Sequence, residues 1–323
     1  MTTAANHATP GGFSDYVRIA RIDHSVKHVF IVPGIVLACL LRGVHTPALP
    51  LSIMLGLVCA VCCASANYVI NEWLDRDFDR HHPTKSARAA VQRVLSGRWV
   101  LAEWIILATV GLACARLTSN SMVMAADLFL LQGIVYNVRP MRLKDQPYLD
   151  VISESVNNPL RLMIGWAMID PTTLPPSSVL LACWLGGAFL MAAKRLSEYR
   201  EVVGAQGRDL LIRYRASFAG YSEETLIVSC FVYALLSSFF LAVFLIKYRV
   251  EYLLLLPIVV VLFGHYLLMS LRPGSAAQAP EKLYRERGLI GLVILFAVVF
   301  GVATIIDLPA MHVFTNQRYI TLP

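Results

Sequence analysis

The sequence NYVINEWLDRDFDRHHPTK, residues 67–85, joins the end of a long apolar run to a dense group of charges. Asn71, Asp75 and Asp79 recur at every fourth position within it. If the helix of the apolar run continues, these three side chains form a stripe along one face, and Asp77 lies off it. The stretch therefore predicts a helix that leaves an apolar region with oxygen-bearing side chains on one side.

The composition of the whole chain places that helix in lipid. The chain has 323 residues, of which 57% are hydrophobic and 15% are charged, and its mean hydropathy is +0.61. Soluble globular domains average roughly 45–50% apolar and about 25% charged residues. Helices can span a bilayer because they satisfy their own backbone hydrogen bonds. We therefore expect an all-α, polytopic membrane protein.

Nine apolar segments approach the roughly 20 residues that a helix needs to cross the hydrocarbon core. The first segment is short, and the fifth contains several polar residues. The segments are residues 29–41, 49–70, 99–117, 122–138, 149–169, 177–193, 225–246, 252–271 and 289–306. The sequence therefore predicts a bundle of about nine transmembrane helices.

Basic residues give the orientation of this bundle, because Lys and Arg concentrate in cytoplasmic loops. With a cytoplasmic N-terminus, 22 of the 28 Lys and Arg residues lie on the inner side and five on the outer side. The net charge of +7 is thus confined to the inner loops and does not indicate a nucleic-acid partner. We expect the N-terminus and the functional site in the cytoplasm, and a location in the bacterial inner (cell) membrane.

The domain organisation follows from the same pattern. The first residues are polar, and the basic stretch after them shows no small-residue cleavage pattern of a signal peptide. We expect a flexible leader over residues 1–15, a single intramembrane domain over 16–306 and a C-terminal tail over 307–323.

The acidic stripe predicts a metal site. Mg²⁺ prefers oxygen ligands, and one or two carboxylates with substrate phosphates and water usually suffice. Asp75, Asp77 and Asp79 would repel one another unless a cation lay among them. We interpret Asp75 and Asp79 as metal ligands and Asn71 as an adjacent oxygen ligand or a substrate-binding donor to a diphosphate. The alternative is a solvated helix end whose acids pair with neighbouring Arg and Lys side chains.

Nine spans with this stripe after the second resemble the UbiA superfamily of intramembrane prenyltransferases. The resemblance implies a helical bundle with cytoplasmic helical cap loops. Within the superfamily, the continuation from His82 to Lys85 is similar to the decaprenyl-phosphate phosphoribosyltransferase branch, which has a nodulation-protein relative in soil bacteria. Further matching pieces are Arg21-x-x-His24-x-x-Lys27, Tyr136, Leu149-Asp150, Lys194-Arg195-x-x-Glu198 and Ala219-Gly220-Tyr221.

One departure separates two branches of that superfamily. Aromatic prenyltransferases carry a second Asp-rich motif after the sixth span, whereas the corresponding loop here has Asp209 as its only aspartate. This favours the phosphoribosyl branch. The stripe also reads Asn71-Glu72 where Asn-Asp is usual, which leaves substrate specificity open.

Fixed cations for phosphate groups follow the second, fourth and sixth spans. Lys85 and Arg88 are placed to hold a sugar 5-phosphate, and the other candidates contribute diphosphate contacts; positive-inside residues are the alternative. These other cations are Arg139, Arg142 and Lys144 after the fourth span, and Lys194 and Arg195 after the sixth. Glu198 is a candidate catalytic residue, with an ion pair to Lys194 as the alternative.

Four further residues complete the candidate substrate site. Lys27, on an amphipathic segment, is expected to bind the phosphate head of a lipid acceptor. Arg161 lies inside the fifth span, where an ionisable side chain is a functional hypothesis, with a pair to Glu154 as the alternative. Asp150 at the start of that span is a candidate for ribose or metal contacts, and the resemblance adds Tyr136 to the substrate-binding residues.

The resemblance implies a Mg²⁺-dependent transferase that moves 5-phosphoribose from phosphoribosyl diphosphate to a polyprenyl phosphate. Such a product is a precursor of lipid-linked arabinose, for cell-wall or secreted nodulation glycans. The catalytic set is then Asp75, Asp79, Lys194 and Glu198, and the branch suggests a homotrimer. The alternatives are an aromatic polyprenyltransferase of quinone-type biosynthesis and a transporter of phosphorylated metabolites.

Overall fold

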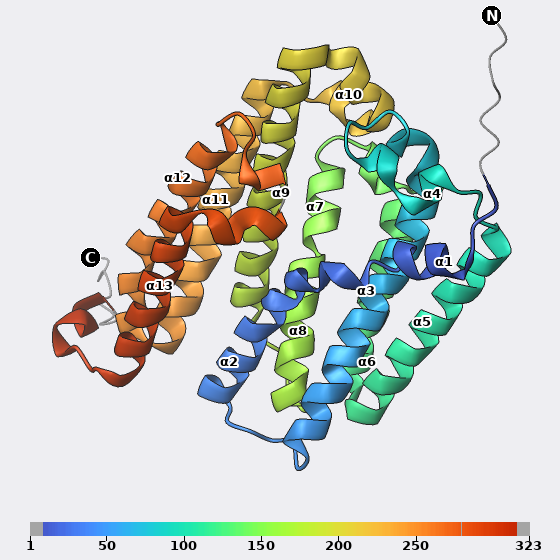
Figure 1. Ribbon diagram of the computed structural model, residues 1–323. Helices are drawn as coiled ribbons and strands as arrows, with labels where there is room; N and C mark the ends of the chain where they lie inside the picture. Colours follow the sequence, from blue (N-terminus) through green and yellow to red (C-terminus); the bar gives the residue numbers. More distant parts are fainter. Residues whose placement is uncertain (1–8, 279, 315–323) are drawn as a thin grey trace, which may run out of the picture. The chain divides into compact units, whose positions relative to one another are not determined.

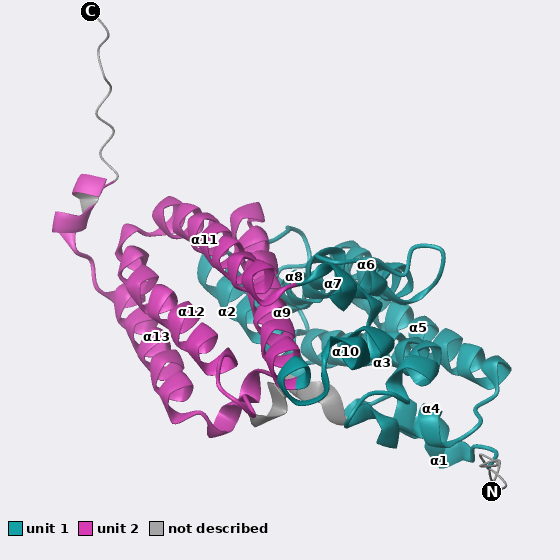
Figure 2. Ribbon diagram, turned by 90° about the horizontal axis from the view of Figure 1, so that it is seen from above, with its two compact units in different colours: residues 1–175, 202–221 teal, residues 176–201, 222–323 magenta. Residues whose placement is uncertain are grey.

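The computed structural model describes residues 9–278 and 280–314, and its architecture is helical (Figure 1). Within these two ranges no β-strand forms, and an isolated bridge joins Pro10 to Val94. The all-α expectation is therefore confirmed. The chain divides into two compact units, unit 1 with residues 1–175 and 202–221, and unit 2 with residues 176–201 and 222–323 (Figure 2). The domain expected over residues 16–306 spans both units.

Unit 1 carries the acidic stripe. Its helices are α1 (Phe13–Ile19), η1 (Ile22–Phe30), α2 (Ile31–Leu41), α3 (Leu49–Asp79), η2 (Lys85–Ala87), α4 (Ala89–Gln92), α5 (Gly97–Thr118), α6 (Asn120–Asn137), η3 (Leu143–Asp145), α7 (Leu149–Ser155), α8 (Asn157–Ile169), α10 (Arg208–Tyr214) and η4 (Ala216–Gly220). Here η marks a short 3₁₀ segment.

Unit 2 is built mainly from long apolar helices. They are α9 (Ser177–Gln206), whose last residues belong to unit 1, then α11 (Glu223–Tyr248), η5 (Val250–Leu255), α12 (Leu256–Ser270), η6 (Ala276–Gln278), η7 (Pro280–Arg285), α13 (Arg287–Ile305) and η8 (Pro309–Phe314).

Helix α3 determines where the site lies. It runs for 31 residues, with Pro50 in its first turn, where a missing backbone N–H costs nothing. The apolar part continues without a break through the charged stretch to Asp79, and Pro83 follows shortly after. The continuation expected from the sequence is confirmed, so Asn71, Asp75 and Asp79 share one face of a single helix.

Helix α8 lies in the interior of unit 1, in contact with α2, α3 and α6 (Figure 1). Every residue from Pro159 to Ile169 is buried. Two glycines allow the backbones of α2 and α8 to touch: a Cβ on Gly34 would lie 2.0 Å from the carbonyl oxygen of Leu162, and one on Gly165 would lie 2.1 Å from that of Ile31. The crossing therefore depends on glycine at both positions.

Helices α3 and α6 are joined in a similar way near the site. The side-chain Nδ2 of Asn67 donates to the carbonyl oxygen of Phe129 at 2.8 Å. A Cβ on Gly133 would lie 1.9 Å from Oδ1 of Asn67, so the buried amide fits only against glycine. This contact fixes the end of α6 against the first turn of the charged part of α3.

The structure contains six helices, within its described ranges, that are long and apolar enough to cross a membrane. They are α3, α5, α9, α11, α13 and the segment Val250–Ser270. The other three expected spans are helical but differ from a long apolar helix. Helix α2 has only 11 residues, and α6 contains the polar residues Asp127 and Gln132. The fifth expected span is divided at Val156 into α7 and α8. The count of nine is therefore not confirmed.

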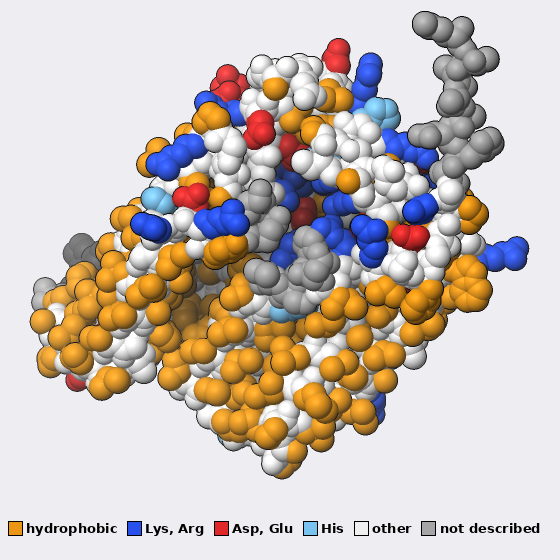
Figure 3. Space-filling model, viewed as in Figure 1, with side chains coloured by type: hydrophobic (Ala, Val, Ile, Leu, Met, Phe, Trp, Pro, Cys, Tyr) orange, Lys and Arg blue, Asp and Glu red, His pale blue; other side chains and the backbone are white. Residues whose placement is uncertain are grey.

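Hydrophobic side chains cover the helices of unit 1 over the lower part of Figure 3, and Lys and Arg side chains gather above them. This separation agrees with a multi-pass membrane protein. At the chain ends, α1 already begins at Phe13, inside the expected leader, and residues 1–8 lie outside the described part. The tail contains η8, and residues 315–323 also lie outside that part.

Substitution of Gly34 by alanine tests the α2–α8 crossing. Because the added methyl group would overlap a backbone oxygen that cannot rotate away, we expect a loss of about 1–3 kcal/mol in the free energy of unfolding. The measurement is thermal unfolding in detergent, followed by size-exclusion chromatography. Gly264→Ala is the matched control, since a Cβ there meets no atom within 4 Å. Equal stability of the two variants would contradict the direct contact between the backbones of α2 and α8.

Candidate active site

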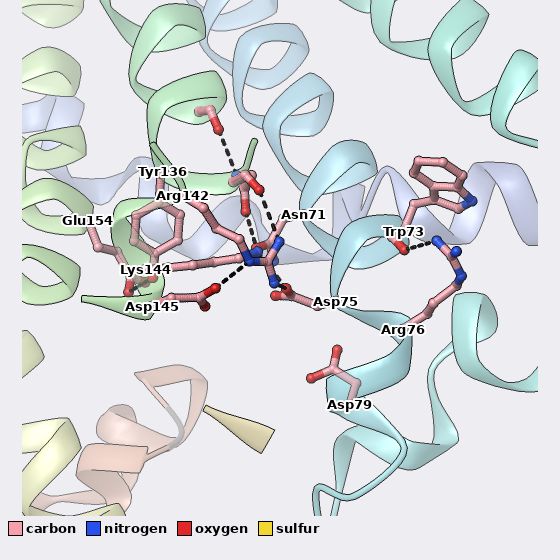
Figure 4. A network of polar contacts seen from close by, with 12 residues as sticks. Asn71, Trp73, Asp75, Arg76, Asp79, Tyr136, Arg142, Lys144, Asp145 and Glu154 are labelled. Carbon is pink, nitrogen blue, oxygen red and sulfur yellow. Dashed lines mark hydrogen bonds and ion pairs between the residues drawn. The ribbon is translucent and has the colours of Figure 1, made fainter. Parts of the chain in front are cut away.

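Asp75, in the middle of the stripe, lies against two cations that come from the loop after α6 (Figure 4). Nζ of Lys144 is 2.5 Å from Oδ1 of Asp75, and the Arg142 guanidinium is 2.8 Å from the same oxygen. The Lys144 side chain is buried and that of Arg142 nearly so. Both contacts involve Oδ1 of Asp75, and neither of them involves its second carboxylate oxygen, Oδ2.

Two asparagines complete the surroundings of Lys144. Its Nζ donates to Oδ1 of Asn137 at 2.7 Å and to Oδ1 of Asn71 at 3.2 Å. Asn137 is the last residue of α6, and its Nδ2 donates to the carbonyl oxygen of Gly133, which orients Oδ1 toward Lys144. The ammonium group therefore links the end of α6 to two residues of the stripe.

Local backbone geometry brings these cations inward. Arg142 adopts a left-handed conformation, with φ of 34°, immediately before η3. Its Nε contacts Asp145 at 2.7 Å, its Nη1 donates to the carbonyl oxygen of Asn137 at 3.0 Å, and its guanidinium lies over the ring of Phe78 at 5.0 Å. Arg142 is thus held on several sides before any substrate is present.

Burial has an electrostatic consequence at Lys144. It lowers the pKa of this ammonium group from 10.5 to about 8, and the neighbouring Arg142 acts in the same direction. Asp75 opposes both effects, because a carboxylate favours the charged form. Lys144 is therefore a cation at neutral pH that a nearby anion stabilises.

Asp79, one turn further along, has its own cation. The Arg88 guanidinium is 2.6 Å from Oδ2 of Asp79, and both side chains are largely buried. Glu72 is buried on α3, lies within electrostatic range of Arg88 and Arg21, and accepts a hydrogen bond from the backbone N–H of Ala90. The acidic residue that replaces the usual aspartate at position 72 thus contacts the segment that carries Arg88.

Asp77 behaves as the helical spacing predicts. Its side chain is 66% exposed and lies 3.8 Å from Arg80, another exposed side chain. It provides an internal comparison with the buried Asp75 and Asp79.

The remaining predicted residues of unit 1 lie in several environments. Arg139 is exposed, so Arg142 and Lys144, not Arg139, contact the stripe. Lys85 is half-buried, and its backbone N–H donates to Nδ1 of His82 at 3.3 Å. Nζ of Lys27 lies 5.5 Å from the centroid of the Tyr68 ring.

Tyr136, near the end of α6, donates from Oη to Glu154 of the fifth predicted span at 2.9 Å. Arg161 is buried, donates to the backbone oxygen of Asn157 at 3.2 Å and lies over the ring of Phe129 at 4.9 Å. Tyr136 and Arg161 are thus buried polar residues of unit 1.

Asp150 is fully buried and holds the segment before α11. It accepts hydrogen bonds from Tyr221 Oη at 2.6 Å and Ser217 Oγ at 3.1 Å, and it pairs with Arg215 at 3.4 Å. Tyr221 Oη in turn accepts from the backbone N–H of Tyr148 at 2.6 Å. These contacts favour an anchoring role for Asp150, and its expected contact with ribose or metal stays a prediction.

Three predicted residues belong to unit 2 and are described within it. Arg195 and Glu198 are buried and pair at 3.3 Å. Lys194 precedes them on α9, one residue before Arg195. Their catalytic and substrate roles stay predictions. The side chain of His24, part of the motif around Lys27, lies outside the described part of the chain.

The donor set of the stripe fits Mg²⁺. Asn71, Asp75 and Asp79 offer one amide oxygen and two carboxylates, the hard ligands that this ion uses together with water and phosphate. Within the described residues, no group of three His, Cys, Asp or Glu side chains is placed to hold a metal by itself. The ion would therefore need ligands from a bound substrate, which is how Mg²⁺ binds in many phosphoryl sites.

These features define a multi-pass helical membrane protein with a charged site at the end of its apolar helices. Residues 30–285 match the UbiA prenyltransferase family, and the chain belongs to this family. The resemblance expected from the sequence is confirmed, and the chain is a UbiA-family prenyltransferase by family membership.

Among its relatives is the decaprenyl-phosphate phosphoribosyltransferase of Mycolicibacterium smegmatis, 26% identical over 229 residues, which are 68% of this chain and 69% of the relative. The nodulation protein NoeC of Azorhizobium caulinodans is 27% identical over 192 residues, 59% of each chain. A UbiA homologue from Archaeoglobus fulgidus, solved with DMAPP and Mg²⁺, has a TM-score of 0.67 at 21% identity and covers 90% of this chain and 100% of its own. The similarity to the Archaeoglobus fulgidus structure shows that the two chains share a fold.

Sequence reasoning missed Asn137 and the residues around Asp150. Asn137 ends an apolar helix, where a polar residue is ordinary, and only its contact with Lys144 makes it part of the site. Ser217 and Arg215 lie more than 60 positions from Asp150 in the chain, so no local pattern relates them. The segment Ala219-Gly220-Tyr221, which matches the family by resemblance, could have indicated the contact between Tyr221 and Asp150.

The Asp75–Lys144 pair predicts a strong energetic coupling. Removal of one partner leaves the other charge buried, so Asp75→Asn and Lys144→Gln should each cost about 3–5 kcal/mol of stability, and the double variant should cost clearly less than their sum. Unfolding in mixed micelles measures this cycle. The exposed Arg200–Glu223 pair is the control and should couple by less than about 1 kcal/mol. Equal coupling in the two cycles would contradict a buried site.

The lowered pKa of Lys144 predicts a pH dependence of stability. Between pH 8 and 10.5 the folded protein holds fewer protons at this site than the unfolded chain does. The free energy of unfolding of the wild type, relative to Lys144→Met, should therefore rise with pH in that window. Unfolding with EDTA present, at several pH values from 7.5 to about 10, measures the difference. A flat or falling difference would contradict the burial of a charged Lys144.

Proposed function

We propose that this protein transfers 5-phosphoribose from phosphoribosyl diphosphate to a polyprenyl phosphate, with Mg²⁺ as cofactor. The observation that carries the proposal is the contact of an acidic stripe with fixed cations: Asp75 with Lys144 and Arg142, and Asp79 with Arg88. A site of this kind can hold a divalent ion and phosphate groups together. Relatives named decaprenyl-phosphate phosphoribosyltransferase, at 26% identity, support the choice of substrates.

Each group of residues has a role in this proposal. Asn71, Asp75 and Asp79 hold Mg²⁺, which supplies a Lewis acid for the leaving diphosphate. Lys144 and Arg142 bind diphosphate oxygens, since they are already positioned and charged at neutral pH. Arg88 and Lys85 hold the 5-phosphate of the ribose. Lys27 binds the phosphate of the lipid, and Tyr136, Arg139, Asp150 and Arg161 are proposed as further substrate-binding residues of unit 1. Lys194 and Glu198 of unit 2 are proposed as catalytic residues, and Arg195 as a substrate-binding residue.

The reaction is a substitution at the anomeric carbon of the ribose. The bond from this carbon to the diphosphate oxygen breaks, a bond to an oxygen of the polyprenyl phosphate forms, and diphosphate leaves. No general base is required, because the acceptor phosphate is already ionised at neutral pH. The protein has to neutralise the leaving group and to orient the acceptor, and fixed cations accomplish both.

The apolar surface explains why such an enzyme belongs in a membrane. The polyprenyl tail stays in hydrocarbon, and its phosphate reaches the interface where the stripe emerges. We place the site on the cytoplasmic side of a bacterial inner membrane, on the basis of the charge asymmetry of the loops. A homotrimer and a product that supplies arabinose to cell-wall or nodulation glycans belong to the same proposal.

The direct test uses purified full-length protein, labelled phosphoribosyl diphosphate and polyprenyl phosphates of several chain lengths. We expect a labelled lipid whose mass equals polyprenyl-phosphoryl-5-phosphoribose, and we expect EDTA to abolish it. Asp75→Asn and Asp79→Asn should each lower turnover by about 100-fold or more, several kcal/mol of barrier. Asp77→Asn is the matched control and should keep most of the activity, because this aspartate is exposed and lies off the stripe.

Three results would contradict the proposal. Near-normal turnover of both Asp75→Asn and Asp79→Asn would remove the metal assignment. Transfer of a prenyl group from a prenyl diphosphate to an aromatic acid, with no phosphoribosyl lipid formed, would establish the aromatic polyprenyltransferase instead. Flux of a phosphorylated metabolite into vesicles without any Mg²⁺-dependent product would identify a transporter.

A further inference from the structure

The N-terminal helix α1 is too short to cross a membrane, and one of its faces is fixed to the segment that leads into α5. The backbone N–H of Gly11 donates to the carbonyl oxygen of Val94 at 3.0 Å, and the N–H of Ser96 donates to Tyr16 Oη at 2.9 Å. Ile19 and Ala20 are buried in a cluster of residues from α3, α4 and α5. Residues 9–20 therefore have a defined position on unit 1.

The exposed side of α1 carries two apolar side chains, Phe13 and Val17, together with Ser14 and Arg18. Phe13 is 85% exposed and Val17 is 45% exposed, and they lie one turn apart on the same side of the helix. The segment docked beside α1 adds Trp99 and Val94, which are 68% and 60% exposed. We call these four residues the N-terminal patch. Nothing in the fold of unit 1 requires them to be apolar, because the core contacts of α1 are made by other residues.

Basic side chains accompany this patch. Arg18, Arg93 and Arg98 are all exposed, and each adjoins a patch residue in sequence. Trp99 lies in the first turn of α5, and Ile106, seven residues later on the same side of that helix, is an apolar side chain that is 62% exposed. Tryptophan at the end of a spanning helix, beside arginines, is typical of the boundary between lipid and water.

We infer that α1 and the segment 93–99 form a membrane-surface anchor that binds anionic phospholipid headgroups. Phe13, Val17, Val94 and Trp99 enter the boundary region of the bilayer, and Arg18, Arg93 and Arg98 contact phosphate oxygens. The occupant follows from two observations: the patch includes the first turn of a spanning helix, and its three exposed arginines outweigh the half-buried carboxylate of Asp15, so its net charge is positive. The inference is independent of which group the enzyme transfers.

The test uses full-length protein in nanodiscs of phosphatidylcholine with 30% phosphatidylglycerol, with a photoreactive benzoylphenylalanine in place of Phe13. Mass spectrometry identifies what this side chain captures on irradiation. We expect phospholipid adducts, with a phosphatidylglycerol share at least twofold above the share in the bilayer. The matched control carries the same group in place of Gln206, an exposed residue of unit 1 at the end of α9, and should capture little lipid.

A second variant separates charge from apolar contact. With Arg18→Gln, Arg93→Gln and Arg98→Gln added, lipid capture at position 13 should persist, and the phosphatidylglycerol share should fall to the bulk value. Capture of a second protein chain, or no capture above the Gln206 control, would overturn the anchor. A phosphatidylglycerol share equal to the bulk value in the arginine-containing protein would overturn the headgroup contact.

Discussion

The buried contact of Asp75 with Lys144 and Arg142 is the interaction on which the site depends. An isolated carboxylate would be expensive at this depth, and so would two isolated cations. Asp75 and Asp145, which also pairs with Arg142, balance the charges of the two cations, and the asparagines at positions 71 and 137 satisfy the remaining donors of Lys144. The arrangement keeps oxygen ligands and phosphate-binding cations within one network before substrate arrives, which reduces the reorganisation that catalysis requires.

That network constrains the fold around it. The acids come from α3 and the cations from the loop after α6, so these two helices must keep their register. Asn67 and Gly133 fix them by a contact that leaves no room for a side chain on the glycine. Asp150 in turn fixes the segment before α11 to the start of α7, which follows the loop that carries Lys144. Apolar packing in unit 1 and these polar contacts therefore both help to hold the cations of the loop after α6 beside the acids of α3.

The sequence predicted the parts of this site that depend on local periodicity. The stripe of Asn71, Asp75 and Asp79 followed from spacing alone, because a helix repeats its faces nearly every fourth residue. The spacing could not predict which cations contact the stripe. Arg142 reaches it because its backbone adopts a left-handed conformation, whereas Arg139 remains exposed. The count of nine spans is not confirmed, because three of the expected spans are short or contain polar residues. Long-range contacts, such as that of Asp150 with Ser217, leave no local pattern.

The central claim, that the stripe binds a divalent ion together with diphosphate, is tested most directly by equilibrium dialysis of Mn²⁺ against full-length protein with phosphoribosyl diphosphate present. The account predicts saturable Mn²⁺ binding that requires the sugar diphosphate, is lost in Asp75→Asn and Asp79→Asn, and is retained in Asp77→Asn. Equal binding by all three variants, or binding unaffected by the sugar diphosphate, would contradict it.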